Sequence, residues 1–170
     1  MASGARRVLG IDPGTASTGY GVVEECDRRL RALASGVIRT GSDEATPARL
    51  QAIHRRIGQL AQQWHPDEAA VEELFFSRNV RTAMSVGQAR GVAILALADA
   101  GVAVAEYTPL AIKQAVTGYG SADKVQMQEM VRMLLGLNDA PEPDDAADAL
   151  AVAICHLHSA RLRDLSEPAG

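Results

Sequence analysis

The stretch VLGIDPGTASTGYGVVE, residues 8–24, decides the predicted fold class. It begins with an apolar run that ends at Asp12, and the Pro13-Gly14 pair that follows predicts a turn into a second strand. Both faces of the first run are apolar, which is typical of a strand in the centre of a sheet. Asp12 would then lie at a strand end, where an open sheet exposes ligand-binding groups.

The rest of the chain reads as an ordered series of strands and helices. The predicted strands cover residues 6–12, 18–25, 30–40, 68–76 and 102–108, and the predicted helices cover residues 46–64, 82–101, 109–116, 123–135 and 145–162. The first three strands would form an antiparallel meander. This element order is that of the ribonuclease H-like fold, an α/β architecture in which a mixed five-stranded sheet is flanked by helices on both faces. We expect one domain over residues 1–170, with flexible ends at 1–6 and 164–170.

Composition limits the class of protein further. No apolar segment reaches the roughly 18 residues of a membrane span, and the first seven residues are too short and too polar for a signal peptide. We therefore expect a soluble, cytoplasmic protein without a membrane partner. Cys26 and Cys155 show no metal-binding spacing such as CxxC, so both are expected to be reduced and to lie in or near the core.

The charge distribution bears on nucleic-acid binding. A formal net charge of −4 argues mildly against a polyanionic partner, because proteins that bind nucleic acid usually present a basic surface. Between residues 78 and 124, however, basic residues face few acids. These basic residues are Arg78, Arg81, Arg90, Lys113 and Lys124. A local basic face therefore remains compatible with DNA binding.

Four acidic residues interrupt apolar segments. Asp12 ends the first strand, and Glu72 lies within the short buried strand 68–76. Asp145 and Asp148 are three residues apart at the start of the last helix, so they would project from one face about 5 to 6 Å apart. Carboxylate clusters of this kind hold Mg²⁺ or Mn²⁺, and two such ions can act on both oxygens of a phosphodiester. We predict that the four acids converge.

Each acid also has a simpler interpretation. Asp12 could open an Asp-Pro-Gly turn. Glu72 and Glu73 point to alternate faces and could both lie at an exposed strand end. Asp144 or Asp145 could cap the last helix, where an acid also complements the helix dipole. Convergence is the simpler account only because it explains all the acids together.

Four stretches of the chain resemble one known family, the RuvC Holliday-junction resolvases. They are GIDPGTASTGYGVV, AVEELFFSRNVRTAMSVGQARGVA, KQAVTGYGSADKVQMQEMV and DDAADALAVAICH. They occur in the family's order and spacing and span about residues 8–158. The resemblance implies a ribonuclease H-like homodimer that resolves four-way DNA junctions by paired symmetric nicks. It also implies two Mg²⁺ ions per site, with Mn²⁺ as a substitute, and 5′-phosphate and 3′-hydroxyl products in recombination and repair.

The resemblance assigns roles to individual residues. The family's catalytic and metal-binding acids fall on Asp12, Glu72, Asp145 and Asp148, and its DNA-contacting residues on Phe75, Lys113 and Lys124. Arg78, from the basic region, joins the predicted DNA-binding residues. The doubled aspartate at 144 and 145 departs from the family pattern, which leaves the choice between these two open. Family members act with the branch-migration proteins RuvA and RuvB, so the same partners are expected.

Three further expectations concern surfaces. Phe75 and Phe76 are adjacent on a strand, so one is expected in the core and the other exposed. The apolar helix of residues 82–100 is the candidate dimer face, although core packing also explains its apolar character. His156 and His158 lie beyond the acids and are expected at the surface or the helix end.

Two other functions fit part of the sequence. GIDPGTASTG also resembles the phosphate-binding hairpin of actin-like and sugar-kinase ATPases, but the chain lacks the second phosphate loop and the second domain that those enzymes need. A catalytically silent junction-binding module would keep the fold without the acids, whereas all four acids are present. A metal-dependent cleavage assay separates this second alternative from a nuclease.

Overall fold

A computed structural model describes residues 4–73 and 79–167 of the chain. Its strands are β1 (Arg6–Asp12), β2 (Ser17–Cys26), β3 (Arg29–Arg39), β4 (Glu68–Glu72) and β5 (Ala103–Tyr107). Its helices are α1 (Thr46–Trp64), α2 (Val80–Asp99), α3 (Pro109–Thr117), α4 (Lys124–Leu134) and α5 (Asp144–Ser166). The strands form one sheet in the order β3-β2-β1-β4-β5. Strands β1 to β3 are antiparallel neighbours, whereas β4 and β5 run parallel to β1.

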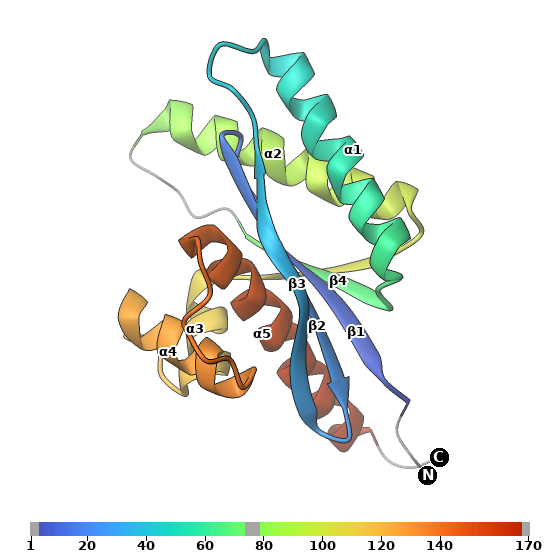
Figure 1. Cartoon of the computed structure of the whole chain (residues 1–170), viewed down its shortest axis with the longest axis vertical. Coiled ribbons are helices and arrows are strands. Elements are labelled where there is room, and N and C mark those ends of the chain that lie inside the picture. Colours follow the sequence, from blue (N-terminus) through green and yellow to red (C-terminus); the bar gives the residue numbers. More distant parts are fainter. Residues whose placement is uncertain (1–3, 74–78, 168–170) are drawn as a thin grey trace.

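Helices cover both faces of this mixed sheet, which confirms the predicted ribonuclease H-like architecture. One buried cluster joins Leu9 and Ile11 of β1 to α1 and α2, and a second joins Val8 to α3, α4 and α5. Figure 1 shows the two helix layers on opposite sides of the strands. The predicted alternation along β1 is therefore correct, and β1 is a central strand between β2 and β4.

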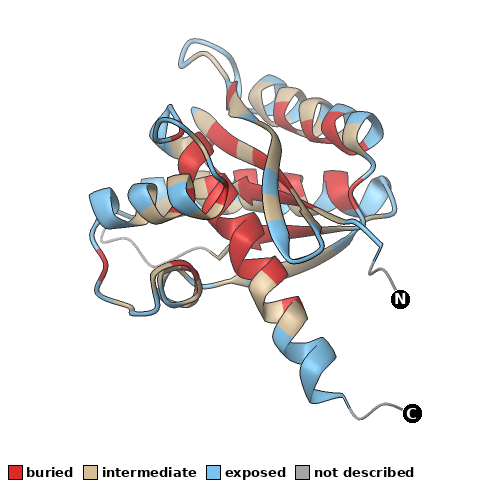
Figure 2. Ribbon diagram, turned by 60° about the horizontal axis from the view of Figure 1, so that its bottom comes forward, coloured by how far each residue is buried: buried red, intermediate tan, exposed pale blue. Residues whose placement is uncertain are grey.

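Helix α5 lies unusually close to the sheet because glycines face it. A Cβ atom at Gly10 would collide with the backbone carbonyl of Ala149, and one at Gly19 would collide with the carbonyl of Asp145. Glycine is the residue that permits such close approach of two backbones. Figure 2 shows α5 buried through most of its length and exposed towards its C-terminal end.

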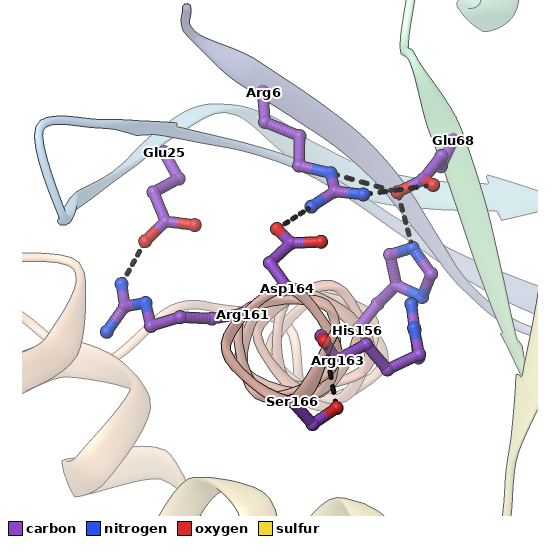
Figure 3. Close-up of polar contacts among 8 residues, drawn as sticks. All are labelled: Arg6, Glu25, Glu68, His156, Arg161, Arg163, Asp164 and Ser166. Carbon is purple, nitrogen blue, oxygen red and sulfur yellow. Dashed lines mark hydrogen bonds and ion pairs between the residues drawn. The ribbon is translucent and has the colours of Figure 1, made fainter. Parts of the chain in front are cut away.

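A polar network ties the middle of α5 to the start of β4 (Figure 3). The ring of His156, which is buried, hydrogen-bonds through Nε2 to Oε2 of Glu68 at 2.7 Å and through Nδ1 to the hydroxyl of Tyr107 at 2.8 Å. Arg6 donates to both carboxylate oxygens of Glu68 at 3.2 Å and pairs with Asp164 near the end of α5. A buried polar ring with two partners meets the requirement that such groups be hydrogen-bonded.

The structure corrects several expectations. His156 is buried and His158 is half-buried, because α5 continues to Ser166 and places both well inside the helix. Within the predicted flexible ends, residue 6 instead begins β1 and residues 164–166 are helical. Cys26 is exposed, because β2 ends there at a hairpin turn, whereas Cys155 is buried as predicted.

Two further findings concern strand β4 and membrane association. The strand ends at Glu72, and the predicted continuation over 74–76 lies outside the described residues. Among the residues described, no helix combines the length and the apolar character needed to cross a bilayer.

Candidate active site

Asp12 is the last residue of β1 and lies at the edge where β1 and β4 both end. The parallel register pairs Ile11 with Val71, so the next residues along the two strands, Asp12 and Glu72, emerge side by side. The turn after β1 is held by the Thr18 hydroxyl, which donates to the carbonyl of Gly14 at 2.5 Å and accepts from its N–H at 3.3 Å. The Asp12 carboxyl group instead lies beside that of Glu72, where the two can share a hydrogen bond only if one of them is protonated.

Helix α5 brings two more carboxylates to this edge. Ligand oxygens of Asp12, Asp145 and Asp148 all lie within 4.8 Å of one another. Both acids lie in the first turns of α5. They point to the same side because residues three apart on a helix share one face. The N-cap of α5 is Pro143, so neither Asp144 nor Asp145 caps the helix. Among the residues that it describes, the structure therefore brings together all four predicted acids. Asp144 is not part of this cluster.

Burial and mutual repulsion change the acidity of the cluster. Burial, reinforced by the neighbouring Glu72, Asp148 and Asp145, raises the pKa of Asp12 from 3.8 to about 9. The pKa of Glu72 is raised chiefly by burial, and its hydrogen bond with Asp12 and the charge of Lys113 oppose that shift. The pKa of Asp148 is also raised chiefly by burial. Carboxylates packed this closely cannot all stay ionised without a compensating positive charge.

A divalent cation fits this donor set. The ligand atoms are carboxylate oxygens, which Mg²⁺ and Mn²⁺ prefer. The pKa values of Asp12 and Asp148 are raised because burial and the neighbouring acids disfavour the charged forms, and a bound cation would balance that charge. The four acids thus have the chemistry and the proximity of a metal site.

A hollow of about 270 Å³ opens beside the acids and holds both predicted DNA-contacting lysines. It is lined by Glu72, Pro109, Ile112, Lys113, Ala122, Asp123, Lys124, Met127, Asp148 and Ala151. Its lining combines acidic side chains, apolar side chains and the two lysines. Phe75 and Arg78 lie outside the described residues, so their predicted contacts with DNA stay predictions.

Two residues of the site were missed in the sequence. Ser17 begins β2, and its hydroxyl donates to Oδ2 of Asp145 at 2.5 Å, which fixes that carboxylate. Gly19 pairs with Asp12 in the β1–β2 register and leaves room for the backbone at Asp145. A glycine inside a strand is a signal of close backbone approach, but the sequence does not say which element approaches.

Comparison with known proteins agrees with this geometry. The profile of the family described as crossover junction endodeoxyribonuclease RuvC matches residues 8–156. The protein of that name from Chloroflexus aurantiacus is 58% identical over 154 residues, which cover 91% of this chain and 94% of the relative. The protein of the same name from Roseiflexus sp. is 56% identical over 156 residues, which cover 92% of this chain and 93% of the relative.

Solved structures give the same result. Thermus thermophilus RuvC in complex with a Holliday junction substrate superposes with a TM-score of 0.89 at 40% identity, over 93% of this chain and 96% of that chain. The yeast mitochondrial Holliday junction resolvase Ydc2, at 15% identity and a TM-score of 0.69 over 94% and 81% of the two chains, shares the fold. From the family profile and these identities, the chain belongs to the RuvC family of crossover junction endodeoxyribonucleases.

Proposed function

We propose that this protein is a metal-dependent endonuclease that resolves four-way DNA junctions by paired symmetric nicks. The observation that carries the proposal is the convergence of Asp12, Asp145 and Asp148 within 4.8 Å, with Glu72 beside Asp12. Membership of the RuvC family supplies the substrate class, since the similar Thermus protein was solved with a Holliday junction. Two Mg²⁺ ions per site, with Mn²⁺ as a substitute, are part of the proposal.

The chain's own residues prepare the site. Asp12 is adjacent to Glu72 and to the two α5 acids, so its carboxylate would hold a divalent ion together with these neighbours. Ser17 holds one oxygen of Asp145 and leaves the other available as a ligand. When bound there, divalent ions would lower the pKa of an attacking water and stabilise charge on the leaving 3′ oxygen. Hydrolysis of this kind leaves a 5′-phosphate and a 3′-hydroxyl.

The hollow beside the acids suits a DNA strand. Lys113 and Lys124 flank it and can contact the phosphates on either side of the cleaved bond. Its apolar lining residues, which include Ile112 and Met127, offer a surface for a sugar or a base. Phe75 is proposed to stack on an unpaired base near the junction centre, with Arg78 as a further phosphate contact.

A homodimer would supply the second nick. Helix α2 packs on α1 through a buried face, and its outer face carries Met84, Gln88, Gly91 and Leu95 at helical spacing. Met84 and Leu95 are 64% and 54% exposed. A Cβ atom at Gly91 would meet nothing within 4 Å, so a second helix has room to cross there. We propose this face as the dimer contact, and RuvA and RuvB as partners by family membership.

Cleavage of a labelled synthetic four-way junction tests the proposed activity. With Mg²⁺, the protein should make paired nicks on the junction and leave linear duplex intact. Asp145→Asn should still bind the junction but cut it at least about 100-fold more slowly, because loss of a metal ligand removes several kcal/mol of transition-state stabilisation. Asp139→Asn removes an equal charge at an exposed position before α5 and serves as the matched control.

Other outcomes would contradict the proposal. Junction binding without cleavage in either Mg²⁺ or Mn²⁺ would make the protein a silent binding module. Cutting of linear duplex at the same rate as the four-way junction would show that the protein does not select junctions. Unchanged cutting by Asp145→Asn would show that the carboxylate at 145 is dispensable.

A further inference from the structure

Asp144 makes contacts unlike those of the neighbouring Asp145. Its Oδ2 atom lies 2.7 Å from Nζ of Lys124, and its Oδ1 atom accepts a hydrogen bond from Nε2 of Gln128 at 2.8 Å. Lys124 and Gln128 are one turn apart on α4, so both contacts reach the same face of that helix. Both carboxylate oxygens of Asp144 are therefore directed to α4 and away from the metal cluster.

Lys124 needs such an anchor because of its place in the helix. Asp123 and Gln126 form a reciprocal capping box, which makes Lys124 the first residue of α4. A cation is disfavoured at this end, since the helix dipole is positive there. The lysine side chain is 58% exposed, so little packing holds it. The hydrogen bond that the Lys124 ammonium donates to Asp144 is the largest of the influences that raise the Lys124 pKa.

Lys124 also stands at a boundary within the site. It lines the hollow beside Glu72 and Asp148, and it lines a second, more open hollow of about 690 Å³ formed with Arg39, Glu142, Pro143, Asp144 and Asp145. A lysine side chain at this boundary can lean over the acids or away from them. The contact with Asp144, at the first residue of α5, selects the position next to the helix that carries Asp145 and Asp148.

We propose that Asp144 is a positioning residue that holds the Lys124 ammonium beside the metal-binding acids, ready to contact a DNA phosphate. This inference rests on the proposed junction-cleaving function. It assigns Asp144 a role outside the metal site, and it explains what the doubled aspartate at 144 and 145 does in this chain.

Lys113 provides an internal control for this role. It lines the same hollow as Lys124, and within residues 4–73 and 79–167 no salt bridge to it is formed. Loss of Asp144 should therefore change the contribution of Lys124 to cleavage and leave that of Lys113 untouched. The pair permits two parallel double-mutant cycles on one site.

The experiment measures junction affinity and single-turnover cleavage separately for Asp144→Asn, Lys124→Gln, Lys113→Gln and the double variants. Asp144→Asn should slow cleavage about threefold to fivefold, the scale of an exposed ion pair. Its junction Kd should stay equal or fall, because one negative charge is removed. In the Lys124→Gln background the same substitution should have no further effect, whereas in the Lys113→Gln background it should again slow cleavage threefold to fivefold.

Two additional measurements separate positioning from metal binding. The Mg²⁺ concentration for half-maximal cleavage should be the same in Asp144→Asn and the wild type, and Asp144→Glu should recover part of the rate. Asp139→Asn should match Asp144→Asn in affinity but cleave at the wild-type rate.

Clear results would overturn the inference. Wild-type cleavage by Asp144→Asn, or an equal slowing in the Lys124→Gln background, would show that Asp144 does not act through Lys124. A loss of 100-fold or more with a raised Mg²⁺ requirement would make Asp144 a metal ligand. If the wild type itself fails to cut junctions, the proposed function fails instead, and that result is distinguishable from the others.

Discussion

Asp12 has the most strongly perturbed acidity among the acids of the site. Its carboxylate is largely buried beside three other acids, and its pKa is raised to about 9. The unfolded chain would ionise this group near its ordinary value of 3.8. Between these two values the folded, metal-free protein binds a proton that the unfolded chain releases. Stability from this group therefore falls as the pH rises from about 4 to about 9.

Asp12→Asn should remove this pH dependence. In the presence of a chelator, the variant should become more stable than the wild type as the pH rises, by on the order of 5 °C in Tm at pH 8 for a chain of this length. Thermal unfolding at pH 5, 7 and 9 measures the difference, and Asp139→Asn is the control for an exposed acid. Unfolding curves that stay parallel at all three pH values would contradict the assigned shift. The same variant should not cleave junctions.

At the scale of elements, the contact between α5 and the sheet sets the distance between the acids. Asp12 is carried by β1, and Asp145 and Asp148 are carried by α5, so their separation depends on how closely the helix approaches. Glycines in β1 and β2 permit that approach. The His156–Glu68 contact holds the same helix to β4, the strand that carries Glu72.

Gly19→Ala should therefore damage both stability and activity. The added methyl group would collide with the α5 backbone at Asp145, which should cost about 1–3 kcal/mol of unfolding free energy as an overpacked contact. Cleavage should fall at least tenfold, because small displacements of catalytic groups are costly. Denaturant unfolding and the junction assay measure the two effects.

Gly58→Ala supplies the matched control in α1. A Cβ atom there would meet nothing within 4 Å, so alanine should raise the stability by up to about 1 kcal/mol through its better helix propensity. If Gly19→Ala and Gly58→Ala changed the unfolding free energy and the cleavage rate equally, close packing of α5 against Gly19 would be refuted.

For the whole molecule, symmetric cleavage depends on the proposed dimer. Leu95→Asp places a charge on the exposed face of α2, near the end of the helix, and should weaken the dimer at least about 100-fold, since a buried unpaired charge at an interface is strongly unfavourable. The monomer should keep its Tm within a few degrees, because Leu95 is exposed in the single chain. Sedimentation velocity and the coupling of the two nicks on one junction are the measurements.

A second exposed leucine tests whether any apolar-to-charged change would have the same effect. Leu165 is 73% exposed near the end of α5, far along the chain from α2. Leu165→Asp should leave both the sedimentation coefficient and the paired nicking unchanged. A dimer that survives Leu95→Asp would place the contact elsewhere.

Local sequence patterns were sufficient to predict the strands and helices and their order along the chain. Alternation identified β1 and its terminal acid, and helical periodicity identified α1 over residues 46–64 with the bounds seen in the structure. These patterns depend on neighbours within one turn or one strand, so a single sequence contains them. The resemblance to the RuvC family then selected the four acids, which the structure brings together.

Tertiary structure alone decided the contacts between distant segments. Asp144 and Asp145 are chemically identical neighbours, yet successive helical residues point about 100° apart, so one faces α4 and the other faces Asp12. His156 was expected at the surface or the helix end because it lies beyond the acids, and its partner Glu68, 88 residues away in the chain, meets it only in the folded protein. Sequence by itself thus selected the four acids that lie together in the folded protein. Packing of α5 against the sheet and α4 decided their partners, because side-chain direction and distance arise only when the elements meet.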